Sequence, residues 1–384
     1  MSDRIDTRPP ILDSAGVTVS GMGIVTPLGC SIEELAHHCE DGGEAVAAPN
    51  ALRISEIPVG AMPADKRARI GRLDRLCRVF LSASYSAVDA ARLEMAPAQA
   101  GRVGLSFGTG FGCLLTNAEY HQKIVESGPA AASPRLFAYT VSSAAAGEVS
   151  IALGITGPNV TAHMGFAAGL GAVGYGVDLI RMGKADVVLA GGADVIGPPL
   201  LDGLRDMGLL KTREQSRPFI DAVPGVWPSE GAGVLVLERE DRARARGARV
   251  WAHIAGYAAG FEPTLTGRTR ESTGIVASMR RALDLSGCAA SDIDLVMSSA
   301  HGTPIDRIEQ RAMEQVFGAP GPRVRAPKAV LGETFAASGV LAIALAAGAH
   351  RLPSSSGAQR EPLVVMVNAL CYSGSIVSLI LRCE

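Results

Sequence analysis

Cysteine is the first residue type in this chain to test for chemistry, because a thiol can act as a nucleophile, a metal ligand or a disulfide partner. The seven cysteines lie far apart, at positions 30, 39, 77, 113, 288, 371 and 383. Their number is odd and no pair has the Cys-x-x-Cys spacing, so neither a disulfide framework nor a zinc site is expected. Scattered free thiols are typical of a reducing cytoplasm. We expect no metal and no cofactor.

Glycine turns after two predicted strands are the next candidates, because such turns can hold a dinucleotide phosphate. Gly21 and Gly23 follow the first strand, and Gly108 and Gly110 follow the second. Both turns lack the third glycine at the spacing of the dinucleotide fingerprint, and Pro27 interrupts the first. The sequence therefore does not predict a dinucleotide site.

The elements that must position any reactive side chain occur twice along the chain. Each half contains, in order, a helix, a strand, a glycine-containing turn, a buried helix that opens with Phe-Ala-Ala, and a further strand. In the second half the turn is His301-Gly302-Thr303. The predicted ranges are 72–93, 103–107, 166–182 and 185–189 in the first half, and 273–285, 293–298, 335 onward and 363–367 in the second.

The size and composition agree with a duplicated α/β protein. The chain has 384 residues, 47% of them hydrophobic, which exceeds the size at which a single core usually stops growing. Alternating strands and helices favour parallel-rich sheets covered by helices. Stacking two such halves gives a five-layer α/β/α/β/α block. We expect a loose arm over residues 1–16, a first half over 17–245 and a second half over 246–384.

The charge pattern excludes several kinds of partner. The formal net charge is −2, without a long block of one sign, so neither nucleic acid nor a membrane surface is expected as a partner. The polar start, residues 1–16, lacks the apolar core of a signal peptide. The longest clean apolar run, residues 340–349, is too short to span a bilayer.

Seven short motifs occur in order across residues 17–381. They are Val17–Gly29, Gly157-Pro158, Ala185–Asp194, Arg217-Pro218-Phe219, Glu230–Gly233, Ala300–Thr303 and Asn368–Leu379. Together they resemble the β-ketoacyl carrier-protein synthases, or ketosynthases, of the thiolase superfamily. The resemblance implies the thiolase fold, with duplicated βαβαβαββ halves, and decarboxylative Claisen condensation. In that family a cysteine at a helix N-terminus takes the acyl chain, and two histidines assist decarboxylation of the malonyl group.

The chain departs from this pattern at the nucleophile. Aligning Gly169 with the family's Thr-Ala-Cys-x-Ser-Gly motif places Phe166 at the cysteine position. A phenyl ring carries no nucleophilic atom, and the next two residues are alanines. We expect the ring of Phe166 to plug the reactive pocket. His163 is a conceivable replacement base, but a lone histidine beside an apolar helix is more often a hydrogen-bonded core residue.

The histidine positions are only half kept. His301 matches the first family histidine, and Asp306 and Glu309 match the acidic pair that follows it, after a segment about three residues shorter. In the second motif Lys328 is retained, but Glu333 replaces the histidine. A carboxylate would repel an enolate instead of stabilising it.

The resemblance also assigns the oxyanion turn, which here includes Tyr372. Cys371 in the same turn is expected to be a small buried residue and not a nucleophile. With two of three catalytic positions changed, no catalytic set is intact. Because such groups act as a unit, we expect the isolated chain to have no condensing activity.

A ketosynthase without its cysteine is similar to the chain-length factor of type II polyketide systems. This subunit pairs with an active ketosynthase (KS-alpha) and shapes the tunnel for a polyketide carried on acyl carrier protein. Phe166 replaces the glutamine common in aromatic-polyketide chain-length factors, which makes a polyene-type product at least as suitable. The tunnel candidates are Phe111, Cys113, Leu114, Thr116, Asn117, Tyr120, Phe137 and Tyr139.

An enzyme with altered chemistry remains the alternative. The resemblance implies that His301, Lys328 and Glu333 converge on one pocket. These groups could serve proton transfer, in malonyl carrier-protein decarboxylation, cyclisation or dehydration.

Overall fold

The computed structural model describes residues 16–40, 51, 53–211, 217–262, 271–351 and 361–383. Of the arm expected over residues 1–16, all but Gly16 lies outside the described residues. The strands are β1 (Val17–Val25), β2 (Val103–Gly108), β3 (Asn159–Ala162), β4 (Val187–Asp194), β5 (Gly231–Arg239), β6 (Ala252–Phe261), β7 (Leu295–Met297), β8 (Arg323–Arg325), β9 (Leu363–Leu370) and β10 (Ser375–Cys383).

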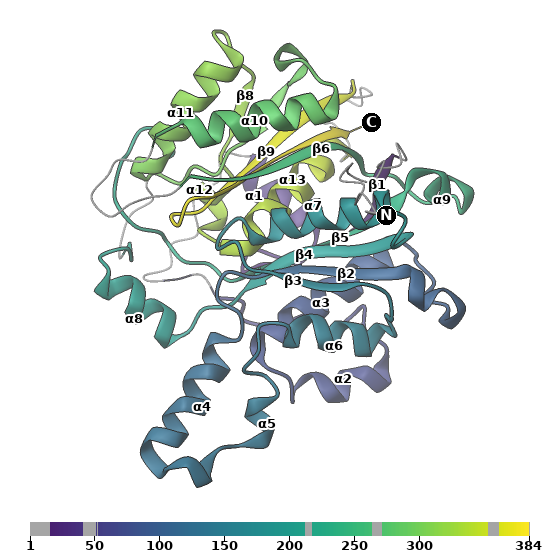
Figure 1. Ribbon diagram of the computed structural model, residues 1–384, viewed down its shortest axis with the longest axis vertical. Helices are drawn as coiled ribbons and strands as arrows, with labels where there is room; N and C mark the ends of the chain where they lie inside the picture. Colours follow the sequence, from purple (N-terminus) through teal and green to yellow (C-terminus); the bar gives the residue numbers. More distant parts are fainter. Residues whose placement is uncertain are drawn as a thin grey trace, which may run out of the picture.

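The strands form one sheet, and helices cover its faces (Figure 1). They are α1 (Ile32–Glu40), α2 (Ala64–Ile70), α3 (Arg75–Ala90), α4 (Leu114–Ser127), α5 (Pro134–Phe137), α6 (Ala144–Leu153), α7 (Ala168–Arg181), α8 (Pro198–Asp206), α9 (Glu240–Ala245), α10 (Thr273–Ser286), α11 (Pro304–Phe317), α12 (Lys328–Leu331) and α13 (Ser338–Arg351). A short 3-10 turn, η4 (Phe335–Ala337), leads directly into α13.

The sheet topology contains the same unit twice. The strand order is β3-β2-β4-β5-β1-β6-β10-β9-β7-β8, so each half has the order 3-2-4-5-1 when its own strands are counted from one to five. In both halves the second strand is parallel to its two neighbours, and the fifth strand is antiparallel to the fourth. An antiparallel pairing of β1 with β6 joins the halves. The expected thiolase-like fold, with duplicated βαβαβαββ halves, is confirmed.

Two buried helices form the central layer of the molecule. α7 and α13 contact each other, and both contact strands of both halves. α3 and α6 cover the outer face of the first half, and α10 and α11 cover that of the second (Figure 1). A Cβ built at Gly169 would lie 2.0 Å from the carbonyl oxygen of Ala336, so the two halves meet backbone to backbone at the starts of the central helices.

The motif Gly21-Met22-Gly23 forms part of a strand and not the tight turn that the glycines suggest. β1 continues through all three residues, with a register shift against β5 between Val19 and Gly21. A Cβ at Gly21 would lie 2.4 Å from the carbonyl oxygen of Ala87, and one at Gly23 would lie 2.0 Å from that of Ala83. These glycines therefore allow α3 to pack against the strand.

Among the described residues, no helix is both long enough and apolar enough to cross a membrane.

Candidate functional site

The start of α7 is formed by a tight turn at Gly165. This residue has a φ of 56°, and a Cβ there would lie 2.4 Å from the Sγ of Cys371. Glycine thus satisfies both the backbone conformation and the lack of space. The amides of Ala167 and Ala168 donate to the carbonyls of Met164 and Gly165, at 3.3 and 3.1 Å. Phe166 lies inside this turn, two residues before the helix begins.

Aromatic rings surround Phe166. Its ring centroid is 5.0 Å from that of Phe335, 5.9 Å from that of Tyr372 and 6.4 Å from that of Phe111. Tyr372 in turn lies 6.4 Å from the ring of His301. These separations are typical of packed aromatic pairs. We call the rings of Phe111, Phe166, Phe335 and Tyr372 the aromatic cluster. The cluster lies where the start of α7 faces the second half.

His301 is the one member of the site with an unused acid–base atom. Its Nδ1 lies 3.2 Å from the carbonyl oxygen of Ser299, so Nδ1 carries the proton and Nε2 is the acceptor. Nε2 is shielded from solvent and has no hydrogen-bond partner among the described residues. Burial, and secondly the Lys328 ammonium, lower the pKa of His301 to about 4. The imidazole is therefore neutral at neutral pH.

The acidic pair after His301 positions the turn that carries it. The carboxylate of Asp306 accepts from the amides of His301 and Gly302, at 3.2 and 2.6 Å, and from the Thr303 hydroxyl at 3.0 Å. Glu309 accepts from the Ser298 hydroxyl at 2.7 Å and from other donors on the same loop. Both carboxylates are buried and occupied, which makes them positioning residues.

Lys328 and Glu333 form a buried ion pair. The Nζ of Lys328 lies 2.7 Å from Oε2 of Glu333 and 2.9 Å from the Ser299 hydroxyl. Oε1 of Glu333 accepts from the Phe335 amide at 2.9 Å and from the Ser338 hydroxyl at 2.8 Å. Both carboxylate oxygens are thus satisfied from within the chain. Ser299 contacts both Lys328 and His301, and Lys328 contacts Glu333, but the oxygens of Glu333 are already used by these structural contacts.

Comparison with known proteins agrees with this architecture. Residues 14–243 match the family described as "Beta-ketoacyl synthase, N-terminal domain", and residues 251–351 match "Beta-ketoacyl synthase, C-terminal domain". The chain belongs to the β-ketoacyl synthase family. It is 28% identical over 345 residues to 3-oxoacyl-[acyl-carrier-protein] synthase 2 of Staphylococcus aureus (strain COL), covering 84% of this chain and 82% of that protein. The same enzyme of Vibrio harveyi is also 28% identical, with 84% and 83% covered.

Solved ketosynthase structures are similar over nearly the whole chain. The structure described as "The ishigamide ketosynthase/chain length factor" is 26% identical, with a TM-score of 0.83, and the match covers 96% of this chain and 99% of that one.

Asp194 is a residue of the site that the sequence motifs did not single out. Its buried carboxylate accepts from the Thr109 hydroxyl at 2.7 Å and from the amides of Gly110, Phe111 and Ala336 at 2.9 to 3.0 Å. Burial raises the pKa of Asp194 to about 6. The carboxylate therefore ties the glycine turn of the first half to η4 in the second. Its position at the end of the Gly-Gly-Ala-Asp motif was the available signal.

The structure separates the residues expected along a tunnel into three groups. Phe111 and Leu114 pack in the same hydrophobic cluster as Phe166. Cys113 and Thr116 lie instead against the start of α3, where the Thr116 hydroxyl donates to Asp74 at 2.5 Å.

The other four tunnel candidates lie further along α4 and at or just after the end of α5. Asn117 donates to the carbonyl of Thr140 at 2.9 Å, and the rings of Tyr120 and Phe137 are 5.9 Å apart. The hydroxyl of Tyr139 donates to Glu148 at 3.0 Å. Of the eight candidates, only Phe111 and Leu114 are brought to the aromatic cluster.

Two further residues have clear positions. His163, for which a core position was expected, is exposed and lies directly after β3. Cys371 is buried, and its Sγ accepts from the Ser373 hydroxyl at 3.2 Å.

Three possible metal ligands, Asp74, Cys77 and Cys113, have ligand atoms within 4.8 Å of one another. The Asp74 oxygens already accept from the Leu76 amide at 2.7 Å and from Thr116, so this carboxylate serves as the N-cap of α3. The contacts explain the cluster as a helix cap with two buried thiols beside it.

Proposed function

We propose that this chain is a non-catalytic chain-length factor that pairs with an active ketosynthase and shapes the acyl tunnel of a type II polyketide system. The observation that carries the proposal is Phe166, which takes the position that the family resemblance assigns to the nucleophile. Its ring lies in the aromatic cluster, and its neighbours in the chain, Gly165, Ala167 and Ala168, carry no thiol or hydroxyl. The 26% identity to a ketosynthase/chain length factor structure supports the same role.

The second changed position supports the proposal independently. Glu333 is buried, and its oxygens are held by Lys328, Ser338 and the Phe335 amide. A carboxylate in this position brings negative charge to the place where an enolate would need a donor. Restoring a nucleophile alone would therefore leave decarboxylative condensation without one of its groups.

One surface of the first half, around the edge strand β3, suits a protein partner. β3 is the edge strand of the sheet, and it carries partly exposed residues. Phe137, Val141 and Ile151, on or beside α5 and α6, are each more than half exposed. An unpaired sheet edge flanked by apolar side chains is typical of a pairing surface. We assign this face to the active ketosynthase subunit.

We assign the limit on the acyl chain to Phe111 and Leu114, and their position in the same hydrophobic cluster as Phe166 supports this assignment. Replacing Leu114 by Trp should shorten the product of the reconstituted pair, because added volume at a packed wall costs steric strain. Cys113→Trp, which would fill the interior against α3, should instead lower stability. Because position 166 holds a bulky aromatic residue in place of a glutamine, we regard a polyene-type product as at least as suitable as an aromatic one.

The deciding experiment follows acyl transfer with radiolabelled acyl and malonyl carrier proteins. The purified chain alone should give neither an acylated protein nor a condensed product. The chain mixed with the ketosynthase encoded in a neighbouring reading frame should give product, and a partner variant without its active-site cysteine should abolish it. Acyl transfer by the chain alone, with every other ketosynthase excluded, would show that the proposal is wrong.

A second candidate function rests on the free Nε2 of His301. A neutral imidazole with an unused acceptor atom can take part in proton transfer, so malonyl carrier-protein decarboxylation by the chain alone is the reaction to test. Release of carbon dioxide that disappears in His301→Ala would support it. If both proteins release none, only the chain-length role remains.

A further inference from the structure

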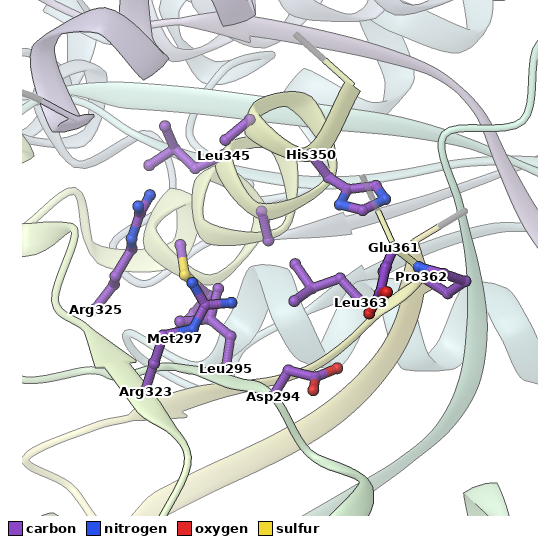
Figure 2. A pocket seen from close by; sticks show the side chains of 12 residues that line it. Asp294, Leu295, Met297, Arg323, Arg325, Leu345, His350, Glu361, Pro362 and Leu363 are labelled. Carbon is purple, nitrogen blue, oxygen red and sulfur yellow. The ribbon is translucent and has the colours of Figure 1, made fainter. Parts of the chain in front are cut away.

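A cavity of about 490 Å³ lies on the second half of the molecule (Figure 2). It is formed by β7, β8, the start of β9 and the last two turns of α13. None of the residues of the aromatic cluster lines it, and neither does His301, Lys328 or Glu333. The cavity is therefore distinct from the site described above.

The floor of the cavity is apolar. Leu295 and Met297 come from alternate positions of β7, and Leu345 comes from α13. All three are almost completely buried. In Figure 2 these side chains and Leu363 lie in the middle of the cavity, between polar groups at its two ends. An apolar floor between charged groups suits a ligand that has both an aliphatic and a charged part.

One end of the cavity carries two arginines. Arg323 and Arg325 are two residues apart on β8, the edge strand of this half, so their side chains lie on the same face of the sheet. Both reach the cavity, and neither has an ion pair or a hydrogen-bonded side-chain partner among the described residues. Two unneutralised guanidinium groups on one wall create a local preference for an anion.

Of the two acidic residues of the cavity, Glu361 lies at the other end, whereas Asp294 comes directly before β7, where its carbonyl oxygen accepts from the Arg323 amide at 3.1 Å. β7 separates β8 from β9, so Glu361, just before β9, is two strand spacings, or roughly 10 Å, away from the arginine strand. Oδ2 of Asp294 already accepts from the Val364 amide at 2.8 Å. Figure 2 shows Glu361 beside His350 and opposite the two arginines. The carboxylates therefore leave the guanidinium groups available.

We propose that this cavity binds a small amphipathic anion, with its head group on Arg323 and Arg325 and its aliphatic chain over Leu295, Met297 and Leu345. Guanidinium groups match the geometry of carboxylate and phosphate, which both serve as such a head group. The volume lies within the range of about 300–1,000 Å³ that is usual for ligand sites. The site is independent of the proposed function, because its residues take no part in either the aromatic cluster or the pairing surface.

Calorimetric titration of the full chain with octanoate and with octyl phosphate tests the proposal, and inorganic phosphate and octanol serve as probes of head and tail alone. At least one of octanoate and octyl phosphate should bind saturably and more tightly than inorganic phosphate or octanol. The octyl anion that binds more tightly identifies the head group. The double variant Arg323→Gln/Arg325→Gln should weaken binding by about tenfold or more, because it removes both charged hydrogen-bond donors from the head group. Arg311→Gln, an exposed arginine on α11, is the matched control and should bind like the unchanged chain.

A cavity-filling variant separates loss of charge from loss of space. Ala346 lines the cavity from α13, so Ala346→Leu should weaken binding of the octyl anions while both arginines stay in place. Thermal unfolding of each variant verifies that it is folded. The proposal is overturned if neither octyl anion binds saturably, if inorganic phosphate binds as tightly as octyl phosphate, or if the double variant and the control bind equally well.

Discussion

The two central helices start with the same Phe-Ala-Ala triplet, but in different surroundings. Before α7, Phe166 is partly buried, and the following amides donate to main-chain carbonyls of the Gly165 turn. Before α13, Phe335 is completely buried, and two carboxylates, Glu333 and Asp194, take the amides of Phe335 and Ala336. A helix N-terminus favours negative charge. Of these two helix starts, the one before α13 has carboxylates bonded to its amides.

Under the proposed function, this difference corresponds to two ways of closing a reactive site. At the first helix start, the position that the family resemblance assigns to the nucleophile holds a hydrocarbon ring that packs against three other rings. At the second, a polar group is kept, but all its hydrogen-bonding capacity is used by Lys328, Ser338 and the main chain. The first change should therefore mainly affect chemistry, and the second mainly affects stability.

Breaking the buried pair at the second helix start should have the largest effect. Lys328→Met leaves the Glu333 carboxylate buried without its cation, which should lower the free energy of unfolding by about 3–5 kcal/mol. Urea denaturation measures the change. The double variant Lys328→Met/Glu333→Leu should lose clearly less. An equal loss in both would mean that the charge of Glu333 is not what the lysine compensates.

Acidification should act through His301, beside the same pair. The unfolded histidine binds a proton near pH 6.5, but the folded one resists until about pH 4, so protons favour the unfolded state in this window. Stability should fall by at most about 3 kcal/mol as the pH decreases from 6.5 to 4. The decrease should be smaller in His301→Gln, as measured by urea midpoints at each pH. Parallel profiles would refute the role of His301.

Opening the aromatic cluster at the first helix start should have a moderate effect. Phe166→Ala should lower the free energy of unfolding by about 2 kcal/mol, less than the 3–5 kcal/mol of a fully buried phenylalanine, because the ring is only partly buried. Thermal or urea unfolding measures it. Phe137→Ala, which removes a largely exposed ring, should stay within about 0.5 kcal/mol of the unchanged chain. Similar losses in the two variants would argue against a packed plug.

The smallest effect is expected when a thiol is introduced at position 166. Phe166→Cys should give no condensing activity in the isolated chain, because Glu333 still occupies the second histidine position. Product formation from labelled malonyl carrier protein is the measurement, and the reconstituted pair serves as the positive control. Condensation by this single variant would show that His301 suffices and that the second helix start does not limit the chemistry.

Local sequence predicted the elements near the site well. Ser31 and Glu34 have the spacing of a capping box, and both of its hydrogen bonds are present at 3.1 Å at the start of α1. The repeat of Phe-Ala-Ala predicted two related central helices. The glycines of β1 were misinterpreted as a turn, because a close approach of α3 and a tight turn both require glycine. Similarly, no local pattern distinguishes a tunnel wall from Thr116 bonded to Asp74 on another helix.

The sequence alone determined the family and the duplicated fold, because these follow from residue type and order, and it led to the proposal that Phe166 and Glu333 stand at the positions of the nucleophile and of a histidine. Only the tertiary structure decided which groups remain available. Lys328 and Glu333 satisfy each other, Asp194 joins the halves, and Nε2 of His301 is left without a partner among the described residues. The physical reason is that hydrogen bonds in a buried site are shared among segments far apart in the chain, so their assignment depends on how the two halves pack together.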